Sequence, residues 1–455
     1  MRSFLLGAPI LFLACSGPLF VHAQSISAKG GCSIRCADGS MQAWGNNGSG
    51  ELGTGDFVGQ NAPVAVSIPS NVASIAPGGL AHSAVITEDG ALWTWGFNFH
   101  GQLGIGTNVD DATPAQVLSD VMAAATGNFH TLAVKNDGTV WAAGINSAGG
   151  LGTGTLTSST TFVQTLITDV IDVAAGLESS VALKSDGSVW AWGLNNYGQL
   201  GNGVGDPSSL PVQVSVTDVQ AIASGRHHVL MLRTDGTVWS FGANLYGGLG
   251  QGTTGLSAPP APVVGLTDVV RISAGEFQSM AIKADGSLWV WGRNAQGQLG
   301  IGSSADIALP AQLTALPFVA DVSTGVFLSM AVDGTGAIWT WGDGTSGGLG
   351  TGNNSSSTVP LPVTAACAVL TTTPENDAPD ELMLAPNPTS GPLWLQSSIS
   401  APMPISVSDI HGRTLYSTTL ANEQRAIDLS PYDAGIYFVS VRTPLGARVL
   451  RVIVE

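Results

Sequence analysis

Alternating apolar and polar positions, interrupted by glycine-containing turns, run through most of the chain. Residues 83–96 (SAVITEDGALWTWG) show the pattern, because two alternating runs flank an Asp-Gly pair. Such a pair predicts a two-residue hairpin turn, since glycine readily adopts the positive φ that this turn needs. The pattern therefore predicts short antiparallel strands and an all-β fold.

The hairpin recurs seven times. Its second strand ends in a glycine that usually follows tryptophan, and the spacings between these glycines are 51, 48, 49, 49, 50 and 50 residues. The glycines are Gly45, Gly96, Gly144, Gly193, Gly242, Gly292 and Gly342. An L-G-x-G segment begins seven residues after each, followed by a Pro/Val strand and a run of small residues. Four short strands per unit are typical of one β-propeller blade.

The repeat count predicts a closed ring. Residues 24–45 and 343–370 lie outside the six complete intervals and together supply one further period of 50 residues. We therefore expect a seven-bladed propeller over residues 24–370, with its two ends meeting in one blade.

Tryptophan and histidine occupy fixed positions in the repeat. Trp44, Trp95, Trp192, Trp291 and Trp341 precede the recurring glycine, and a packed ladder explains them without a chromophore. His82, His130 and His228 share one repeat position. Equivalent positions on different blades are too far apart for ligands that must lie about 2 Å from one metal ion. We interpret these histidines as structural and predict neither a metal site nor a cofactor.

The two ends of the chain have a different character. Residues 1–23 contain an apolar run followed by Val21-His22-Ala23, which predicts a signal peptide and a mature start at Gln24. An uncleaved anchor and lipidation at Cys15 are the alternatives, and no stable membrane span is expected. Residues 371–382 read as an acidic, proline-containing linker, and residues 383–455 alternate over several strands, which predicts a small Ig-like β-sandwich.

Three cysteines remain after the predicted cleavage. Cys32 and Cys36 lie four residues apart, about 13 Å in an extended strand, which is too far for a mutual disulfide. Either one could instead pair with Cys367 and latch the ring. Three unpaired buried thiols are the alternative.

Composition excludes several classes of function. The 455 residues include 15 basic and 32 acidic side chains, a net charge of −17, so a phosphate-neutralising nucleic-acid surface is not expected. The sequence contains neither a G-x-S-x-G nor an H-E-x-x-H motif, and its glycine-rich loops follow a strand without opening a helix. We therefore predict a non-catalytic protein without a nucleotide site.

Candidate contacts for a partner lie in the loops of the repeat, because propellers bind through loops on a fixed scaffold. Aromatic residues and arginine are the usual anchors of protein interfaces. The candidates are Phe97, Phe99, His100, Tyr197 and Tyr246 after the recurring glycine, and Arg226 and His227 before the histidine position. Phe129, Phe277 and Phe327, also before that position, are interpreted mainly as blade packing.

The repeat resembles the regulator of chromosome condensation repeat. Residues 126–140 (TGNFHTLAVKNDGTV) and 291–302 (WGRNAQGQLGIG) carry nearly the whole motif. Ser179, Gln278 and Leu328 depart from its histidine, and Gly344 departs from its loop asparagine. The resemblance implies a seven-bladed propeller. It also suggests two functions: guanine-nucleotide exchange on a small GTPase, as in the founding member, or binding by contact alone, as in a secreted inhibitor of β-lactamases.

The tail resembles the type A C-terminal sorting domain of type IX secretion in Bacteroidetes-like bacteria. Its landmarks are Pro386-Asn387-Pro388, the segment from Asp409 to Arg413, and Gly435-Ile436-Tyr437. An ordinary adhesive sandwich is the alternative. The resemblance implies that the secretion machinery reads residues 383–455. We therefore expect a secreted or cell-surface module that binds an unidentified protein or glycan, with exchange-factor activity as the alternative.

Overall fold

The computed structural model describes most of the repeat region and the strands of the tail. The described residues are 23–24, 32–36, 38–76 and 81–364 in the repeat region, and 383–385, 393–396, 403–409, 414–420, 426–429, 431–432, 435–443 and 446–454 in the tail. The chain divides into two compact units, Val21–Val369 and one that contains Leu370–Glu455. Residues 1–22 of the predicted signal peptide and the whole predicted linker lie outside the described residues.

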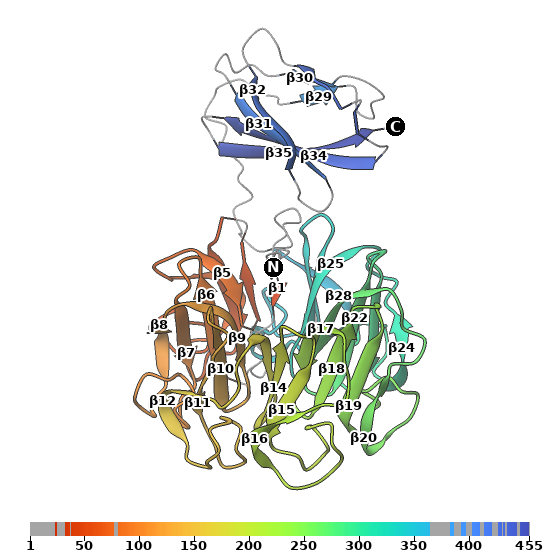
Figure 1. Ribbon diagram of the computed structural model, residues 1–455. Coiled ribbons are helices and arrows are strands. Elements are labelled where there is room, and N and C mark those ends of the chain that lie inside the picture. Colours follow the sequence, from red (N-terminus) through yellow and green to blue (C-terminus); the bar gives the residue numbers. More distant parts are fainter. Residues whose placement is uncertain are drawn as a thin grey trace, which may run out of the picture. The chain divides into compact units, whose positions relative to one another are not determined.

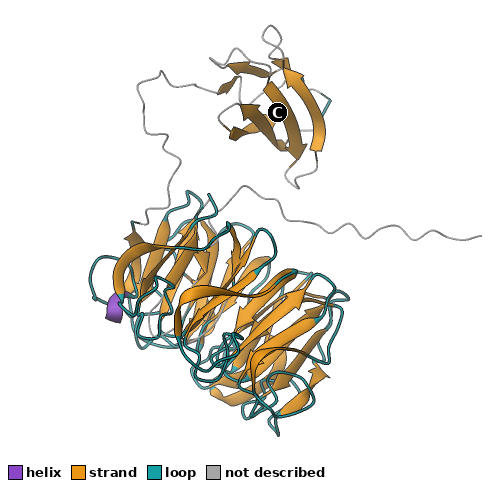
Figure 2. Ribbon diagram, turned by 90° about the vertical axis from the view of Figure 1, so that its left-hand side faces the viewer, coloured by secondary structure: helices purple, strands orange, loops and turns teal. Residues whose placement is uncertain are grey.

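Seven antiparallel sheets of four strands each make up the described part of Val21–Val369. They stand side by side around a ring (Figure 1), which confirms the predicted all-β, seven-bladed propeller. Among the described residues the helical structure is the 3₁₀ turn η1 (Thr345–Gly347) (Figure 2). The described residues contain no helix with the length and hydrophobicity needed to cross a bilayer.

All blades share one strand order. The first strands are β1 (Ala23–Gln24), β5 (Val72–Ile75), β9 (Val121–Thr126), β13 (Val170–Ala175), β17 (Val219–Ser224), β21 (Val269–Ala274) and β25 (Val319–Thr324). The second strands are β2 (Cys32–Arg35), β6 (His82–Thr87), β10 (His130–Lys135), β14 (Ser179–Lys184), β18 (His228–Arg233), β22 (Gln278–Lys283) and β26 (Leu328–Asp333). The third strands are β3 (Met41–Gly45), β7 (Leu92–Gly96), β11 (Val140–Gly144), β15 (Val189–Gly193), β19 (Val238–Asn244), β23 (Leu288–Gly292) and β27 (Ile338–Gly342). The fourth strands are β4 (Gln60–Val66), β8 (Asp111–Leu118), β12 (Ser159–Gln164), β16 (Ser208–Gln213), β20 (Gly255–Pro262), β24 (Ile307–Gln312) and β28 (Ser357–Val363).

The small-residue run of the repeat is the first strand of a blade. It pairs with the strand that follows it, as β5 does with β6, and not with the Pro/Val strand that precedes it, β4. A unit counted from one Trp-Gly pair to the next therefore straddles two blades. First strands of neighbouring blades contact each other, so they line the ring axis.

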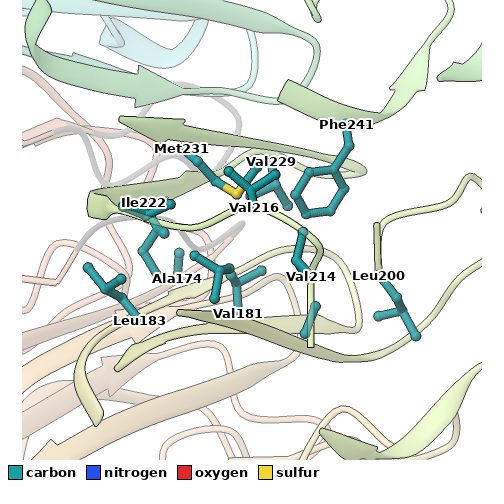
Figure 3. Packing of buried hydrophobic residues seen from close by; sticks show 13 residues of the cluster. Ala174, Val181, Leu183, Leu200, Val214, Val216, Ile222, Val229, Met231 and Phe241 are labelled. Carbon is teal, nitrogen blue, oxygen red and sulfur yellow. The ribbon is translucent and has the colours of Figure 1, made fainter. Parts of the chain in front are cut away.

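The apolar core lies between neighbouring sheets. Val181 and Leu183 of β14 face Val229 and Met231 of β18 and Phe241 of β19 (Figure 3). Alternating positions on each strand point to opposite neighbours, so every sheet contributes to two interfaces. Since each interface is a separate cluster, the ring is stabilised by contacts that repeat from blade to blade.

The tryptophan ladder connects blades by hydrogen bonds. Trp192 Nε1 donates to the carbonyl oxygen of Gly150 in the preceding blade at 2.8 Å. Gly152 lies against the same indole, where a Cβ atom would be 2.7 Å from Nε1, which explains the first glycine of L-G-x-G. Trp44, Trp95, Trp291 and Trp341 donate in the same way to Gly348, Glu51, Gly248 and Gln298. All five indoles are fully buried, which confirms the predicted core position.

The ring closes between the first and the last sheet. Ile34 and Met330 belong to one buried cluster, and Trp44 Nε1 donates to the Gly348 carbonyl at 3.1 Å. Within the described residues the two chain ends meet as neighbouring blades, because β1 belongs to the first sheet and β28 to the last. The sequence predicted a shared blade instead; residues 365–370, which that prediction includes, lie outside the described residues.

The two cysteines of the first blade differ in state. Cys36 is disulfide-bonded, whereas Cys32 is a buried free thiol whose Sγ lies 3.6 Å from the Gly348 carbonyl oxygen. Burial raises the pKa of the Cys32 thiol. Of the two candidates left open by the sequence, Cys36 is therefore the bonded one. Its predicted partner, Cys367, lies outside the described residues.

The tail contains two antiparallel sheets. One has the order β29-β30-β33 and the other β32-β31-β34-β35. The strands are β29 (Met383–Ala385), β30 (Leu393–Gln396), β31 (Met403–Asp409), β32 (Thr414–Leu420), β33 (Ala426–Ile427), β34 (Gly435–Thr443) and β35 (Gly446–Val454). Buried apolar side chains come from both sheets, including Ile427 from the first and Val407 and Val439 from the second. The Ig-like sandwich stays a prediction.

Candidate functional site

One end of the propeller is formed where third strands end and second strands begin, and we call it the Trp-Gly face. Gly193 is the last residue of β15 and has a φ of +95°. A side chain at this position would collide with the Glu178 carbonyl oxygen. The next N–H, of Leu194, donates to that oxygen at 3.0 Å. Each of blades two to seven thus presents two adjacent side chains. In blades two to seven the pairs are Ala81 and Phe97, Phe129 and Ile145, Glu178 and Leu194, His227 and Ala243, Phe277 and Arg293, and Phe327 and Asp343.

In the first six blades an asparagine holds the loop after the third strand. Asn195 is buried, its Oδ1 accepts from Leu200 N at 3.1 Å, and its Nδ2 donates to Gly203 O at 3.1 Å. Gln199 Oε1 accepts from Tyr197 N at 2.7 Å. The candidate Tyr197 therefore lies on a backbone held in place by Asn195 and Gln199. The sequence did not reveal this role of the two amide side chains.

The structure brings the first three candidates together. Phe99 and His100 have ring centroids 5.1 Å apart, and His100 lies 5.0 Å from Phe129 of the next blade. Phe97 stacks on Phe99 at 6.5 Å. Phe99 is 67% exposed, so its ring is available to a partner. We call Phe97, Phe99, His100 and Phe129 the Phe99 cluster.

A second cluster contains the remaining aromatic candidates. Tyr197 lies 4.9 Å from His227, His227 lies 6.3 Å from Phe277, and Tyr246 lies 5.1 Å from Phe277. Arg293 Cζ lies over three rings at 5.0 Å from Tyr246, 5.6 Å from Phe277 and 5.1 Å from Phe327. The Arg293 cluster is Tyr197, His227, Tyr246, Phe277, Arg293 and Phe327.

Three features of this face differ between the prediction and the structure. Arg226, a candidate, forms an ion pair with the buried Glu276 and makes no ring contact among the described residues. Arg293 was not a candidate, although its place directly after the Trp-Gly pair was a usable signal. The phenylalanines interpreted mainly as blade packing are half-buried and join the candidate residues. Between the clusters Ser147 Oγ donates to Glu178 Oε2 at 2.7 Å.

The repeat histidines form bonds between blades. His82 Nε2 lies 2.9 Å from Thr131 Oγ1, and His130 and His228 contact serines of the next blade at the same distance. All three rings are buried. Within the described ranges no three His, Cys, Asp or Glu side chains are grouped to hold a metal ion. These contacts agree with a structural role for the histidines.

Burial of these histidines predicts a loss of stability in mild acid. Burial lowers the pKa of His130 from 6.5 to about 4. The unfolded chain then binds more protons between these values, so the free energy of unfolding should fall as pH drops from 6.5 toward 4, by up to about 1.4 kcal/mol per pH unit for each histidine. Urea titrations across this range should show the slope.

The substitution His130→Gln provides the control, because Gln278 already occupies the equivalent position and donates to Gly325 O at 2.8 Å. This variant should make the slope between pH 4 and 6.5 less steep, while His82 and His228 keep their lowered pKa values. The turn carboxylate of Asp137 titrates below this pH range. Hydrogen bonds, of which the largest is that from Thr139, hold its pKa below 3.8. An unchanged slope in the variant would contradict the assignment.

Sequence comparisons divide the chain as the structure does. The profile of the RCC1-like domain matches residues 115–377, and that of the regulator of chromosome condensation (RCC1) repeat matches residues 38–86 and 89–134. The profile of the secretion system C-terminal sorting domain matches residues 383–455. The type IX sorting tail is thereby confirmed, and it supports export of the protein.

Individual relatives match shorter stretches. The ultraviolet-B receptor UVR8 of Arabidopsis thaliana is 34% identical over 89 residues, 19% of this chain and 20% of that protein. The probable E3 ubiquitin-protein ligase HERC3 of Homo sapiens is 38% identical over 89 residues, 19% of this chain and 8% of that protein. The matches thus span one fifth or less of these two relatives.

Solved structures share the fold over most of the repeat region. Prp20p from Saccharomyces cerevisiae has a TM-score of 0.67 at 24% identity, covering 77% of this chain and 88% of that chain. Human WBSCR16 has a TM-score of 0.60 at 26% identity, covering 68% and 86%. Since the RCC1-like domain profile also spans more than half of the sequence, this chain belongs to the RCC1-like domain family.

Proposed function

We propose that this protein is an exported, non-catalytic binding module that recognises a protein or glycan through its Trp-Gly face. The observation that carries the proposal is that ring contacts join aromatic residues of several blades at one end of the ring. Rigid aromatic side chains on a fixed scaffold are typical anchors of binding sites. The sorting domain would be read by the type IX secretion machinery, which would place the propeller at the cell surface or in the medium.

Exchange of guanine nucleotides on a small GTPase is the weaker alternative. The likeness to Prp20p lies below 25% identity and therefore concerns the fold. We expect no acceleration of nucleotide release when the protein is added to bacterial GTPases loaded with a fluorescent nucleotide.

Capture of a partner tests the proposal. The immobilised full chain is exposed to the medium and outer-membrane extract of the producing bacterium, and bound material is quantified by mass spectrometry. Replacing both Tyr197 and Tyr246 by Ala should weaken retention of the partner at least about tenfold, because interface tyrosines often each contribute more than 1.4 kcal/mol.

The matched control is Phe318→Ala. Phe318 is 47% exposed and lies beside Gly286, in the turn at the opposite end of the ring. It removes an exposed aromatic ring while leaving the Trp-Gly face intact. Retention that survives the double tyrosine variant but is lost in Phe318→Ala would mean that the opposite face binds.

A further inference from the structure

Among the described cations of the propeller, Arg293 differs in having no acidic partner within the described residues. The unit contains eight described Lys and Arg residues. Five form ion pairs: Arg35 with Glu88, Lys184 with Asp169, Arg226 with Glu276, Arg233 with Asp218 and Asp235, and Arg271 with Asp321. Hydrogen bonds from Thr139 and Ser287 are the main cause of the lowered pKa values of Asp137 and Asp285. The nearby charges of Lys135 and Lys283 lower these pKa values further. Arg293 has no such carboxylate among the described residues.

The side chain of Arg293 is nevertheless fixed in place. Its guanidinium lies over the rings of Tyr246, Phe277 and Phe327, and its backbone N–H donates to the Phe277 carbonyl at 3.2 Å. Its Nε is buried and has no hydrogen-bond partner within the described part of the chain. The cation is therefore oriented by π-systems, while its Nε–H makes no hydrogen bond to the described residues.

Two acidic groups near Arg293 in the repeat are engaged elsewhere, and a third, Asp306, accepts from Asn294 N at 2.7 Å. Asp343, at the equivalent position of the next blade, accepts from Thr345 N at 3.0 Å and from Ser356 Oγ at 3.3 Å. Glu276, which precedes Phe277 in the chain, pairs with Arg226. The positive charge of Arg293 is therefore available to a group from outside the molecule.

The chemistry of the groups around Arg293 favours one kind of ligand group. A planar guanidinium with unused N–H donors matches a carboxylate, and stacked rings favour apolar atoms beside it. The net charge of −17 repels a polyanion such as an acidic polysaccharide. A single carboxylate, in contrast, interacts mainly with the adjacent charge of Arg293. We propose that the Arg293 cluster binds a partner protein through one Asp or Glu side chain flanked by apolar side chains. This inference rests on the proposed function and specifies the partner.

Peptide selection tests this proposal with a defined probe. A displayed library of random 12-residue peptides is selected on the immobilised full chain. Selected peptides should carry Asp or Glu beside Leu, Phe, Tyr or Trp. For a synthetic selected peptide, we expect Arg293→Gln to weaken the measured affinity about tenfold to a hundredfold, the usual range for a hydrogen-bonded charge pair.

A double-mutant cycle assigns the contact. Changing the peptide acid to its amide should weaken binding to the unaltered protein by the same factor and should have little further effect on Arg293→Gln. Arg293→Lys keeps the charge without the planar fork and should be intermediate. Arg233→Gln is the control, because it removes a cation at the turn end of β18. Near-ultraviolet circular dichroism should be the same for all variants.

Several results would overturn the proposal. They are selected peptides without acidic residues, no selected peptide at all, or equal affinities of the unaltered protein and Arg293→Gln. Binding of a galacturonate trisaccharide that depends on Arg293, without peptide binding, would assign the site to a glycan instead. A natural partner lost by the double tyrosine variant but kept by Arg293→Gln would leave the proposed function standing and remove this anion site.

Discussion

Replacing Trp192 by Ala is expected to lower the free energy of unfolding of the propeller by about 3–5 kcal/mol. Trp192 is fully buried and packs in one cluster with Leu132, Val134 and Val140 of the preceding blade. The substitution would remove this packing and also the hydrogen bond to Gly150. Urea denaturation followed by far-ultraviolet circular dichroism measures the loss.

Two further variants separate packing from hydrogen bonding. Trp192→Phe should cost much less, about 1 kcal/mol for the lost hydrogen bond plus a small packing term, because Phe241 is fully buried at the equivalent position of the next blade. Trp190→Ala, two residues earlier on the same strand, removes a partly exposed ring and should have a smaller effect than Trp192→Ala. Equal losses for the two alanine variants would contradict the role assigned to the buried indole.

Replacing Cys36 by Ser is expected to lower the stability of the ring by about 3–5 kcal/mol. Cys36 is disulfide-bonded, and we expect its partner to be Cys367. Such a bridge would enclose nearly the whole propeller, and cross-links that close long loops restrict the unfolded chain most in the loop-entropy description. Denaturation midpoints of the variant and of the oxidised protein should show the difference.

Alkylation with mass spectrometry identifies the bridge. In the mature chain starting at Gln24, the unfolded, unreduced protein should take up one alkyl group, at Cys32, and three after reduction. In the folded protein Cys32 should resist, because it is 1% exposed and burial raises the pKa of its thiol. Cys32→Ala should keep the bridge. If all three thiols reacted without reduction, the predicted disulfide between Cys36 and Cys367 would be wrong.

The repeat made much of the fold predictable, but not the limits of the blades. The Asp-Gly turns and the Trp-Gly strand ends require particular backbone conformations, and these leave marks in the sequence. Which of two flanking strands the small-residue run joins depends on hydrogen-bond partners, which residue spacing does not reveal. The structure pairs β5 with β6, so the unit counted from the sequence was out of phase with the blade.

The candidate residues on the Trp-Gly face were found by residue type and loop position. Tyr197 and Tyr246 lie 49 residues apart, and only the packing of blades shows that both touch a connected set of rings through His227 and Phe277. Arg226 satisfied the same sequence rule but is engaged by Glu276. An ion pair between adjacent blades cannot be inferred from spacing within one repeat.

Sequence patterns alone were enough to predict the seven-bladed ring, the sorting tail and the fixed positions of the buried tryptophans, because each depends on short-range patterns that repeat or on a contiguous motif. The folded arrangement was needed to show that Cys36 is bonded and Cys32 free, and that Arg293 lies among three rings with no acidic partner in the described residues. These properties belong to the surroundings of a side chain, which are assembled from blades distant in the chain.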